Sequence, residues 1–218
     1  MQLVLLGPPG AGKGTLASTV AGRTGMRHIS TGDLFRAAVK ARTPLGRRVA
    51  DLLQAGSLVP DSLTISLVRE HLATLDERKG FILDGFPRTV PQAAALAGFA
   101  QLDAAVELIV PEQEVVRRLS GRRTCARCGA TFNVASMPAN ASLFCAPVQR
   151  EDDDPEAIRR RLHAYRAQTT PVIEYYRSTG LLRGIDGTAT PNEVADLMQA
   201  VLARRSGLLP PCRARRAR

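Results

Sequence analysis

The sequence predicts an α/β protein in which helices cover both faces of a five-stranded parallel sheet. Short apolar runs alternate along the chain with longer segments whose apolar residues recur at helical spacing, as expected for β–α units. The first apolar run also passes directly into a glycine-rich loop, and a helical segment follows that loop. We expect strands at residues 3–6, 28–30, 81–83, 106–110 and 181–185.

The loop after the first strand, residues 7–15 (GPPGAGKGT), is predicted to bind phosphate. Such a loop turns several backbone N–H groups toward one point at a helix N-terminus, and Lys13 adds a positive charge. The spacing departs from the strict G-x-x-x-x-G-K-[ST] pattern, because Gly14 follows the lysine and the hydroxyl comes only at Thr15. A metal ion at this site would therefore depend on other ligands, on waters and on an acid further along the chain.

Helix starts are marked by proline, which is favoured at the first helical position. We expect Pro111, Pro155 and Pro191 to occupy that position in three helices. Apolar stripes at helical spacing predict core helices over residues 61–75 and 191–203.

Two stretches interrupt the strand and helix rhythm. Residues 30–59 are helical in pattern, whereas residues 121–154 are rich in turns, poor in apolar residues and hold three cysteines. We interpret both as inserts over one sheet. The predicted organisation is a single domain over residues 1–203, with a core of residues 1–29, 60–120 and 155–203, followed by a basic tail over 204–218.

Composition excludes several classes of protein. The 218 residues carry a net charge of +10, but six arginines lie in the tail, which we expect to be disordered, and the rest of the chain keeps only 24 bases against 20 acids. That excess does not require nucleic acid as a partner. No apolar run is long enough for a membrane span, and the chain begins inside a strand, so no signal segment is expected. Four cysteines are too few for a disulfide scaffold and favour a reducing, cytoplasmic location.

An acid follows the third predicted strand. Asp84 comes directly after residues 81–83, and ligands of parallel α/β sheets gather at this carboxyl edge. Asp84 could hold Mg²⁺ directly or through water, although an acid at a strand end also serves as a helix cap or a surface turn. Arg88 then brings a guanidinium to the same edge.

Arginines are the second charged feature of the chain, which has only three lysines. Planar guanidinium groups bind phosphoryl oxygens bidentately and keep their charge, so a ring of them around a phosphate loop suits a transferring phosphoryl group. Arg161 lies at the margin of an apolar helix stripe and can point into a cleft, whereas Arg159 and Arg160 are expected to face water. Arg118, Arg122 and Arg123 bracket Gly121, where the second insert begins.

Several motifs together resemble the adenylate kinase family from residue 1 to about residue 203. They are residues 7–15, Ser30-Thr31-Gly32-Asp33 with Arg36, residues 83–88 (LDGFPR), Gln92, residues 121–123 (GRR) and residues 186–188 (DGT). The resemblance implies reversible transfer of a phosphoryl group from Mg·ATP to AMP, giving two ADP, by a monomer. It also implies that residues 30–59 bind AMP and that residues 121–154 form a mobile lid.

The resemblance further implies the binding residues. ATP would contact Gly10, Ala11, Gly12, Lys13, Gly14, Thr15, Arg118, Arg122, Thr131, Phe132 and the backbone at Ala189. AMP would contact Thr31, Arg36, Leu58, Val59, Gly85, Phe86, Pro87, Arg88, Gln92, Arg150 and Arg161. The residues that act on the reacting phosphates would be Lys13, Arg88, Arg122, Arg150 and Arg161. Gly121 and the acids Asp152–Asp154 would serve as lid hinges, Asp154 as a helix cap and its neighbours as favourable charges at the same helix end.

The cysteines depart from the pattern of a zinc-bearing lid. Cys125, Cys128 and Cys145 match three thiolate positions of such a lid, but the fourth position is Val148. Two hypotheses remain: a three-thiolate zinc site completed by water or an aspartate, or a lid without metal. The second would fold by hydrogen bonds and by packing of Phe132, Val134 and Phe144.

Two other functions are compatible with the phosphate loop. One is a related kinase with a different monophosphate acceptor, although Thr31 and Gln92 resemble the AMP-specific pattern. The other is a nucleotide-binding regulator that uses the basic tail. A guanine-nucleotide switch is disfavoured because the chain has no N-K-x-D motif.

Overall fold

The structure is a computed structural model that describes residues 1–76, 79–127, 129–136 and 146–203. The predictions that concern Cys128, Phe144, Cys145 and the tail over 204–218 lie outside the described residues.

Five parallel strands form the central sheet, as predicted, in the order β2-β3-β1-β4-β8. Leu3 at its centre pairs with Ile82 on one side and with Ala104 on the other. The strands are β1 (Gln2–Leu6), β2 (Arg27–Ser30), β3 (Phe81–Asp84), β4 (Ala104–Ile109) and β8 (Leu182–Asp186).

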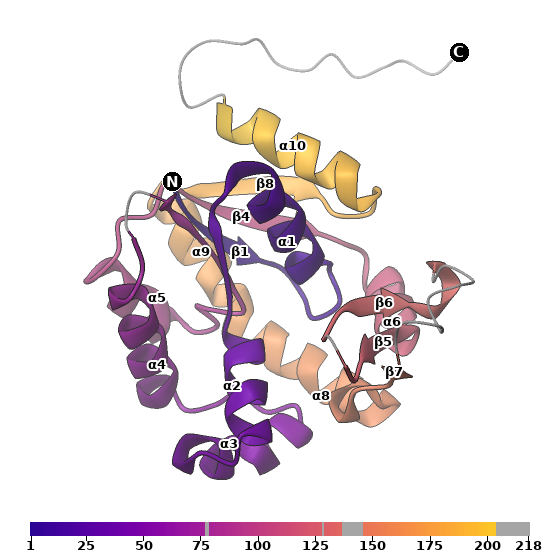
Figure 1. Ribbon diagram of the computed structural model, residues 1–218. Helices are drawn as coiled ribbons and strands as arrows, with labels where there is room; N and C mark the ends of the chain where they lie inside the picture. Colours follow the sequence, from indigo (N-terminus) through magenta and orange to yellow (C-terminus); the bar gives the residue numbers. More distant parts are fainter. Residues whose placement is uncertain (77–78, 128, 137–145, 204–218) are drawn as a thin grey trace, which may run out of the picture.

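Helices cover both faces of the sheet (Figure 1). Side chains alternate between the faces of a strand, so Leu3 and Leu5 pack with one group of helices and Val4 and Leu6 with the other. The first face is covered by α1 (Lys13–Thr24) and α10 (Pro191–Ala203). The second face is covered by α4 (Asp61–Ala73), α5 (Val90–Ala97) and α9 (Thr170–Ser178).

Proline and its preceding cap set several helix starts. Pro155 opens α8 (Pro155–Ala164), and the Asp154 side chain accepts hydrogen bonds from the amides of Glu156 and Ala157 at 2.8 and 3.0 Å. Pro191 opens α10 as predicted. Pro111 lies one position earlier than expected, because its extended backbone (ψ 143°) makes it the cap of α6 (Glu112–Ser120).

Residues 30–59 form two helices that pack on each other, α2 (Thr31–Lys40) and α3 (Pro44–Gln54). Their contact has its own apolar cluster around Phe35, Val49 and Val59, separate from the clusters on the two faces of the sheet. The loop after α3 lies against α8, where the Nε atom of Arg160 donates to the carbonyl oxygen of Ala55 at 2.9 Å.

The segment 121–154 contains a small antiparallel sheet that the sequence did not indicate. Its strands, β5 (Arg122–Cys125), β6 (Thr131–Asn133) and β7 (Pro147–Val148), lie in the order β6-β5-β7. Each is only two to four residues long and carries few apolar side chains, so no alternating pattern marks it. Two short 3₁₀ turns, η2 (Val134–Ser136) and η3 (Glu151–Asp153), accompany it, and a π-helical turn, η4 (Tyr165–Thr169), joins α8 to α9.

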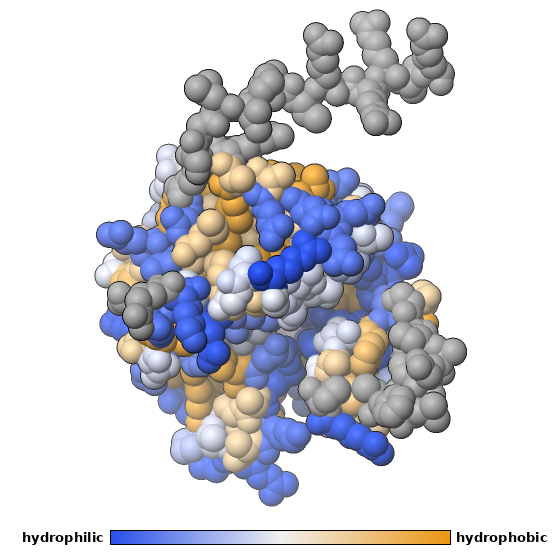
Figure 2. Space-filling view, turned by 45° about the horizontal axis from the view of Figure 1, so that its top comes forward, coloured by the Kyte–Doolittle hydropathy of each residue, from blue (hydrophilic) through white to orange (hydrophobic). Residues whose placement is uncertain are grey.

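Hydrophilic residues occupy much of the face shown in Figure 2, with apolar residues gathered in patches. Within the described ranges, none of the helices has both the length and the apolar character needed to cross a bilayer.

Candidate active site

The glycine-rich loop connects β1 to α1 and has a tightly constrained backbone. Gly10 and Gly12 have φ values of +84° and +98°, which residues with a side chain rarely adopt. A Cβ atom at Gly10 would also lie 2.7 Å from Cγ of Leu119 in α6. Lys13, the first residue of α1, folds back over the loop, and its Nζ atom donates to the carbonyl oxygens of Gly7 (2.7 Å) and Pro8 (2.8 Å).

Asp84 faces the start of α1 from the end of β3. A Cβ atom on Gly14 would have Asp84 Oδ2 3.2 Å away, so a side chain after the lysine would crowd this carboxylate. His28 of β2 is also near, with Nε2 3.7 Å from Asp84 Oδ2. Burial raises the pKa of Asp84, but the nearby His28, Lys13 and Arg88 outweigh burial and hold the pKa of the carboxyl below its usual value.

Cations crowd one another around this carboxylate. Burial lowers the pKa of Lys13 to about 8, although Asp84 opposes the shift. The pKa of Arg88 falls to about 10 through burial and through the neighbouring Arg161, and that of Arg150 falls to about 10 through burial and through nearby arginines. Positive charges that depress one another's pKa form a strong site for a polyanion.

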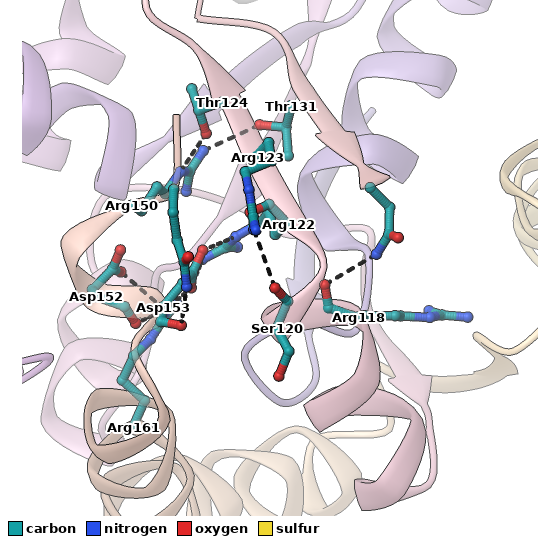
Figure 3. Close-up of polar contacts among 12 residues, drawn as sticks. Arg118, Ser120, Arg122, Arg123, Thr124, Thr131, Arg150, Asp152, Asp153 and Arg161 are labelled. Carbon is teal, nitrogen blue, oxygen red and sulfur yellow. Dashed lines mark hydrogen bonds and ion pairs between the residues drawn. The ribbon is translucent and has the colours of Figure 1, made fainter. Parts of the chain in front are cut away.

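Two of the arginines pair with acids (Figure 3). Arg122 donates from Nε and Nη2 to the two carboxylate oxygens of Asp153, at 2.6 and 2.5 Å. Arg161 Nη1 lies 2.9 Å from Asp153 Oδ1 and 3.0 Å from Asp152 Oδ2. The Asp153 side chain is 0% exposed, so it forms the buried centre of an ion-pair cluster that joins the start of β5 to α8.

Two further arginines hold loops together. Arg150 donates to the hydroxyl groups of Thr124 (2.8 Å) and Thr131 (3.1 Å) in the small sheet. Arg118 donates from Nη1 to the carbonyl oxygens of Ala11 (3.1 Å) and Gly187 (2.9 Å). Arg118 therefore braces the glycine-rich loop against the loop that follows β8.

These side chains surround a cleft of about 1050 Å³, large enough for more than one small-molecule ligand. The predicted site residues that line it are Gly10, Ala11, Gly12, Lys13, Gly14, Thr15, Arg36, Leu58, Asp84, Gly85, Pro87, Arg88, Arg118, Arg122, Thr131, Phe132, Arg150, Arg161 and Ala189. Thr31, Val59, Phe86 and Gln92 do not line it; all four are buried. Arg159 and Arg160 are exposed, as expected.

Two of the buried residues are bonded to residues of the cleft wall. The Thr31 hydroxyl donates to the carbonyl oxygen of Gly85 at 2.9 Å. The amide of Arg88 donates to Gln92 Oε1 at 2.8 Å, and Gln92 Nε2 donates to Asp61 Oδ1 at 2.7 Å.

Sequence reasoning missed several residues of this site. Asp152 and Asp153 were interpreted as charges that favour the helix end, yet they pair with arginines of the cleft. The one sequence signal for these ion pairs is that both acids lie in a run of acids close to Arg161 in the sequence. Nothing in the local pattern marks His28 or Asp61, because their partners lie on other elements.

The glycine-rich loop between β1 and α1, the acid at the end of β3 and the surrounding arginines are the features of a P-loop phosphotransferase built on a parallel sheet. Comparison with known sequences gives the particular family. A model of the family described as adenylate kinase matches residues 5–181. A protein named adenylate kinase from Geobacter sp. (strain M21) is 48% identical over 214 residues, which cover 93% of this chain and 100% of the relative. Another from Citrifermentans bemidjiense is 50% identical over 200 residues, 87% of this chain and 94% of the relative. The chain belongs to the adenylate kinase family.

Proposed function

We propose that this adenylate kinase transfers the terminal phosphoryl group of ATP to AMP, reversibly, within the arginine-lined cleft, with the residue roles given below. The observation that carries the proposal is the group of cations that line one cleft: Lys13, Arg88, Arg150 and Arg161. Burial lowers the pKa of each, and neighbouring cations lower it further. Two nucleotides that meet through their phosphates supply the charge that would relieve this repulsion.

ATP would occupy the side of the cleft next to the glycine-rich loop. Backbone N–H groups of residues 10–15 and the Lys13 ammonium would hold its phosphates. Thr131, Phe132 and Ala189 line the same cleft and would contact the rest of the nucleotide. Arg118 would act mainly by bracing the loop, because its guanidinium already donates to backbone carbonyl groups.

AMP would bind between residues 30–59 and the segment that follows β3. Arg36 and Arg88 would bind its phosphate, and Arg150 and Arg161 would bridge the reacting groups. Support comes from Leu58, Gly85 and Pro87, which line the cleft beside these arginines. Thr31, Val59, Phe86 and Gln92 would contact AMP when the cleft rearranges around it.

Catalysis would consist of positioning and charge neutralisation. Asp153 balances the charges of Arg122 and Arg161. When phosphates enter, some N–H groups of these guanidinium groups would donate to phosphoryl oxygens instead of to Asp153. Residues 30–59 and 121–154 would close over the cleft and keep water out. In an open cleft, water could accept the phosphoryl group in place of AMP, and ATP would be hydrolysed. The apolar cluster of the first segment, against which Leu63 and Leu67 of α4 pack, and the small sheet of the second support this division.

Magnesium fits the site, whereas zinc lacks support among the described residues. Asp84 is a buried carboxylate beside the loop and would hold Mg²⁺, directly or through water; the ion would neutralise phosphate charge. Cys125 is buried in β5, but Val148 of β7 has no donor atom, and the described residues contain no cluster of three groups able to bind a metal ion.

The oligomeric state and the location of the enzyme complete the proposal. We propose that the enzyme works as a monomer, since one chain supplies every residue of the cleft. A cytoplasmic location would suit its few cysteines, which favour a reducing compartment.

The decisive experiment measures ADP formation from ATP and AMP, with each nucleotide omitted in turn. ADP should form only when both are present, and CMP, UMP and GMP should be poor acceptors. The proposal would be contradicted if ATP were consumed without an acceptor nucleotide, or if no ATP were consumed in the presence of AMP.

A residue test accompanies this assay. Arg161→Ala should lower turnover by about a thousandfold, the scale of an arginine that stabilises phosphoryl transfer. The exposed neighbour Arg159 provides the control, and Arg159→Ala should turn over normally. Normal turnover in Arg161→Ala would remove that residue from the proposed site.

A further inference from the structure

Gln92 is held by two partners of opposite hydrogen-bonding character. Its side-chain oxygen accepts from the backbone N–H of Arg88 at 2.8 Å, and its side-chain nitrogen donates to Asp61 Oδ1 at 2.7 Å. A backbone N–H can only donate and a carboxylate can only accept. The contacts therefore fix which end of the Gln92 amide is oxygen and which is nitrogen. Gln92 is 2% exposed, so water is a poor substitute for either partner.

Asp61 is itself fixed at the start of α4. It is the first residue of that helix, where the helix dipole favours a negative charge. Its second oxygen, Oδ2, accepts from the Thr89 hydroxyl at 2.8 Å. Thr89 also caps α5, the helix that carries Gln92, by accepting from the Gln92 backbone amide. Asp61 thus links the end of the segment 30–59 to the helix that carries Gln92.

The orientation of an amide decides which purine edge it can bind. After these two contacts Gln92 keeps one N–H donor and one oxygen lone pair. On its N1 edge, adenine presents a ring-nitrogen acceptor beside its 6-amino donor, and this pair matches an amide bidentately. Hypoxanthine presents the reverse, an oxygen acceptor beside a ring N–H donor, and an amide turned by 180° would match it equally well. A glutamine free to turn would therefore discriminate poorly between the two bases.

We propose that Asp61 is a positioning residue for base selection: by holding the Gln92 amide in one orientation, it makes the acceptor site favour AMP over a 6-oxopurine monophosphate. This inference rests on the proposed function, in which Gln92 contacts AMP. Asp61 acts through Gln92 and needs no contact with the nucleotide. The backbone N–H of Arg88 supplies the second constraint, which no side-chain substitution at position 61 removes.

The test compares AMP with inosine monophosphate, which differs from AMP only at this edge of the base. Asp61→Leu removes the acceptor oxygen while keeping a side chain of similar length. It should lower the ratio of kcat/KM for AMP to that for inosine monophosphate by about tenfold, as expected when one orienting hydrogen bond is lost. The KM for ATP should not change, because Asp61 lies on the acceptor side.

Asp61→Asn is the matched control. Its side-chain oxygen can still accept from Gln92, while its amide group donates to the Thr89 hydroxyl, which can also act as an acceptor. The Asn variant should therefore keep the wild-type ratio. If the Leu variant does not fold, Asp61→Ala removes the same oxygen without added bulk.

Each result bears on one of the two proposals. The role of Asp61 would be overturned if the ratio of kcat/KM for AMP to that for inosine monophosphate stayed unchanged in the Leu or Ala variant. It would also be overturned if the Asn variant lowered this ratio as much as the Leu variant does. A wild-type enzyme that does not use AMP at all would instead contradict the proposed function.

Discussion

At the scale of single residues, Gly14 shows why this loop departs from the strict phosphate-loop pattern. The residue after the lysine has no side chain, and a Cβ atom there would lie 3.2 Å from the Asp84 carboxylate. The carboxylate and a side chain at position 14 therefore compete for the same space. In this enzyme the acid from β3 occupies it.

This competition predicts the effect of a methyl group. Gly14→Ala should displace the Asp84 carboxylate by a few tenths of an ångström and raise the Mg²⁺ concentration for half-maximal activity by about tenfold, the effect of disturbing an ion's supporting groups. Gly22 in the same helix is the control, because a Cβ there meets nothing within 4 Å. Gly22→Ala should add about 0.5–1 kcal/mol of stability without changing the Mg²⁺ response. An unaltered Mg²⁺ titration in Gly14→Ala would show that Asp84 does not serve the metal.

Asp153 is the other residue on which the charged site depends. With its side chain fully buried, it balances two guanidinium groups, Arg122 and Arg161, whose side chains are 17% and 15% exposed. Asp153→Asn should lower the free energy of unfolding by about 3 kcal/mol, because it leaves the largely buried Arg122 without a counter-charge and Arg161 with Asp152 alone.

The adjacent Asp154 offers a comparison in thermal unfolding. It is a helix cap, and asparagine caps about as well, so Asp154→Asn should lower the melting temperature much less than Asp153→Asn does. Equal melting temperatures for the two Asn variants would mean that the ion-pair cluster adds nothing to stability.

At the scale of secondary-structure elements, the segment 121–154 is held by pairing of short strands. β5 pairs with β6 from Arg122 to Thr124 and with β7 at Thr124 and Cys125. Arg150 adds hydrogen bonds to Thr124 and Thr131 across this sheet. Backbone pairing and buried Cys125 thus give the segment a framework that uses no metal ligand at position 148.

Metal analysis tests this interpretation. Enzyme purified without chelator should contain far less than one equivalent of zinc, because Val148 stands where a fourth ligand is needed. Treatment with a chelator should leave the melting temperature unchanged. One tightly held zinc ion per chain, with a loss of stability on its removal, would establish the three-thiolate site instead.

Elements also show which features the sequence predicts and which it does not. The phosphate loop and the helix start at Pro155 depend on neighbours in the chain, so local pattern was sufficient. β5, β6 and β7 are too short for a periodic signal and form through contacts with one another. Asp153 and Arg122 are 31 positions apart, and Gln92 and Asp61 are also 31 apart, so only the folded chain reveals these pairs. The nucleotide contacts of the individual residues remain predictions.

At the scale of the whole molecule, the fold gathers cations from distant segments into one cleft. Lys13 comes from α1, Arg88 from the loop after β3, and Arg161 from α8. Burial, and to a smaller extent the neighbouring cations, lowers the pKa values of Lys13 and Arg88. Nucleotide binding should therefore be coupled to protonation.

The coupling has a definite sign. With a pKa of about 8, Lys13 loses its proton as the pH rises through that value, whereas bound phosphates stabilise its charged form and raise the pKa. ATP binding should take up protons above about pH 8, and ATP affinity should fall there as the pH rises. Calorimetry in buffers of different ionisation enthalpy measures this uptake. Lys13→Met removes the titrating group, so this uptake of protons should be missing when the variant binds ATP. Wild-type enzyme that binds ATP without proton uptake at about pH 9 would show that Lys13 is not the group that takes up the proton.

The contact between Arg160 and the carbonyl oxygen of Ala55 has a consequence for motion. This hydrogen bond between α8 and the loop after α3 is exposed, so a water molecule can replace Ala55 as its partner. Its net contribution is about 1 kcal/mol, which is close to thermal energy. Releasing it changes the populations of the docked and undocked arrangements by only about fivefold. In the proposed closure of residues 30–59 over the cleft, this hydrogen bond would therefore oppose their release from α8 only weakly.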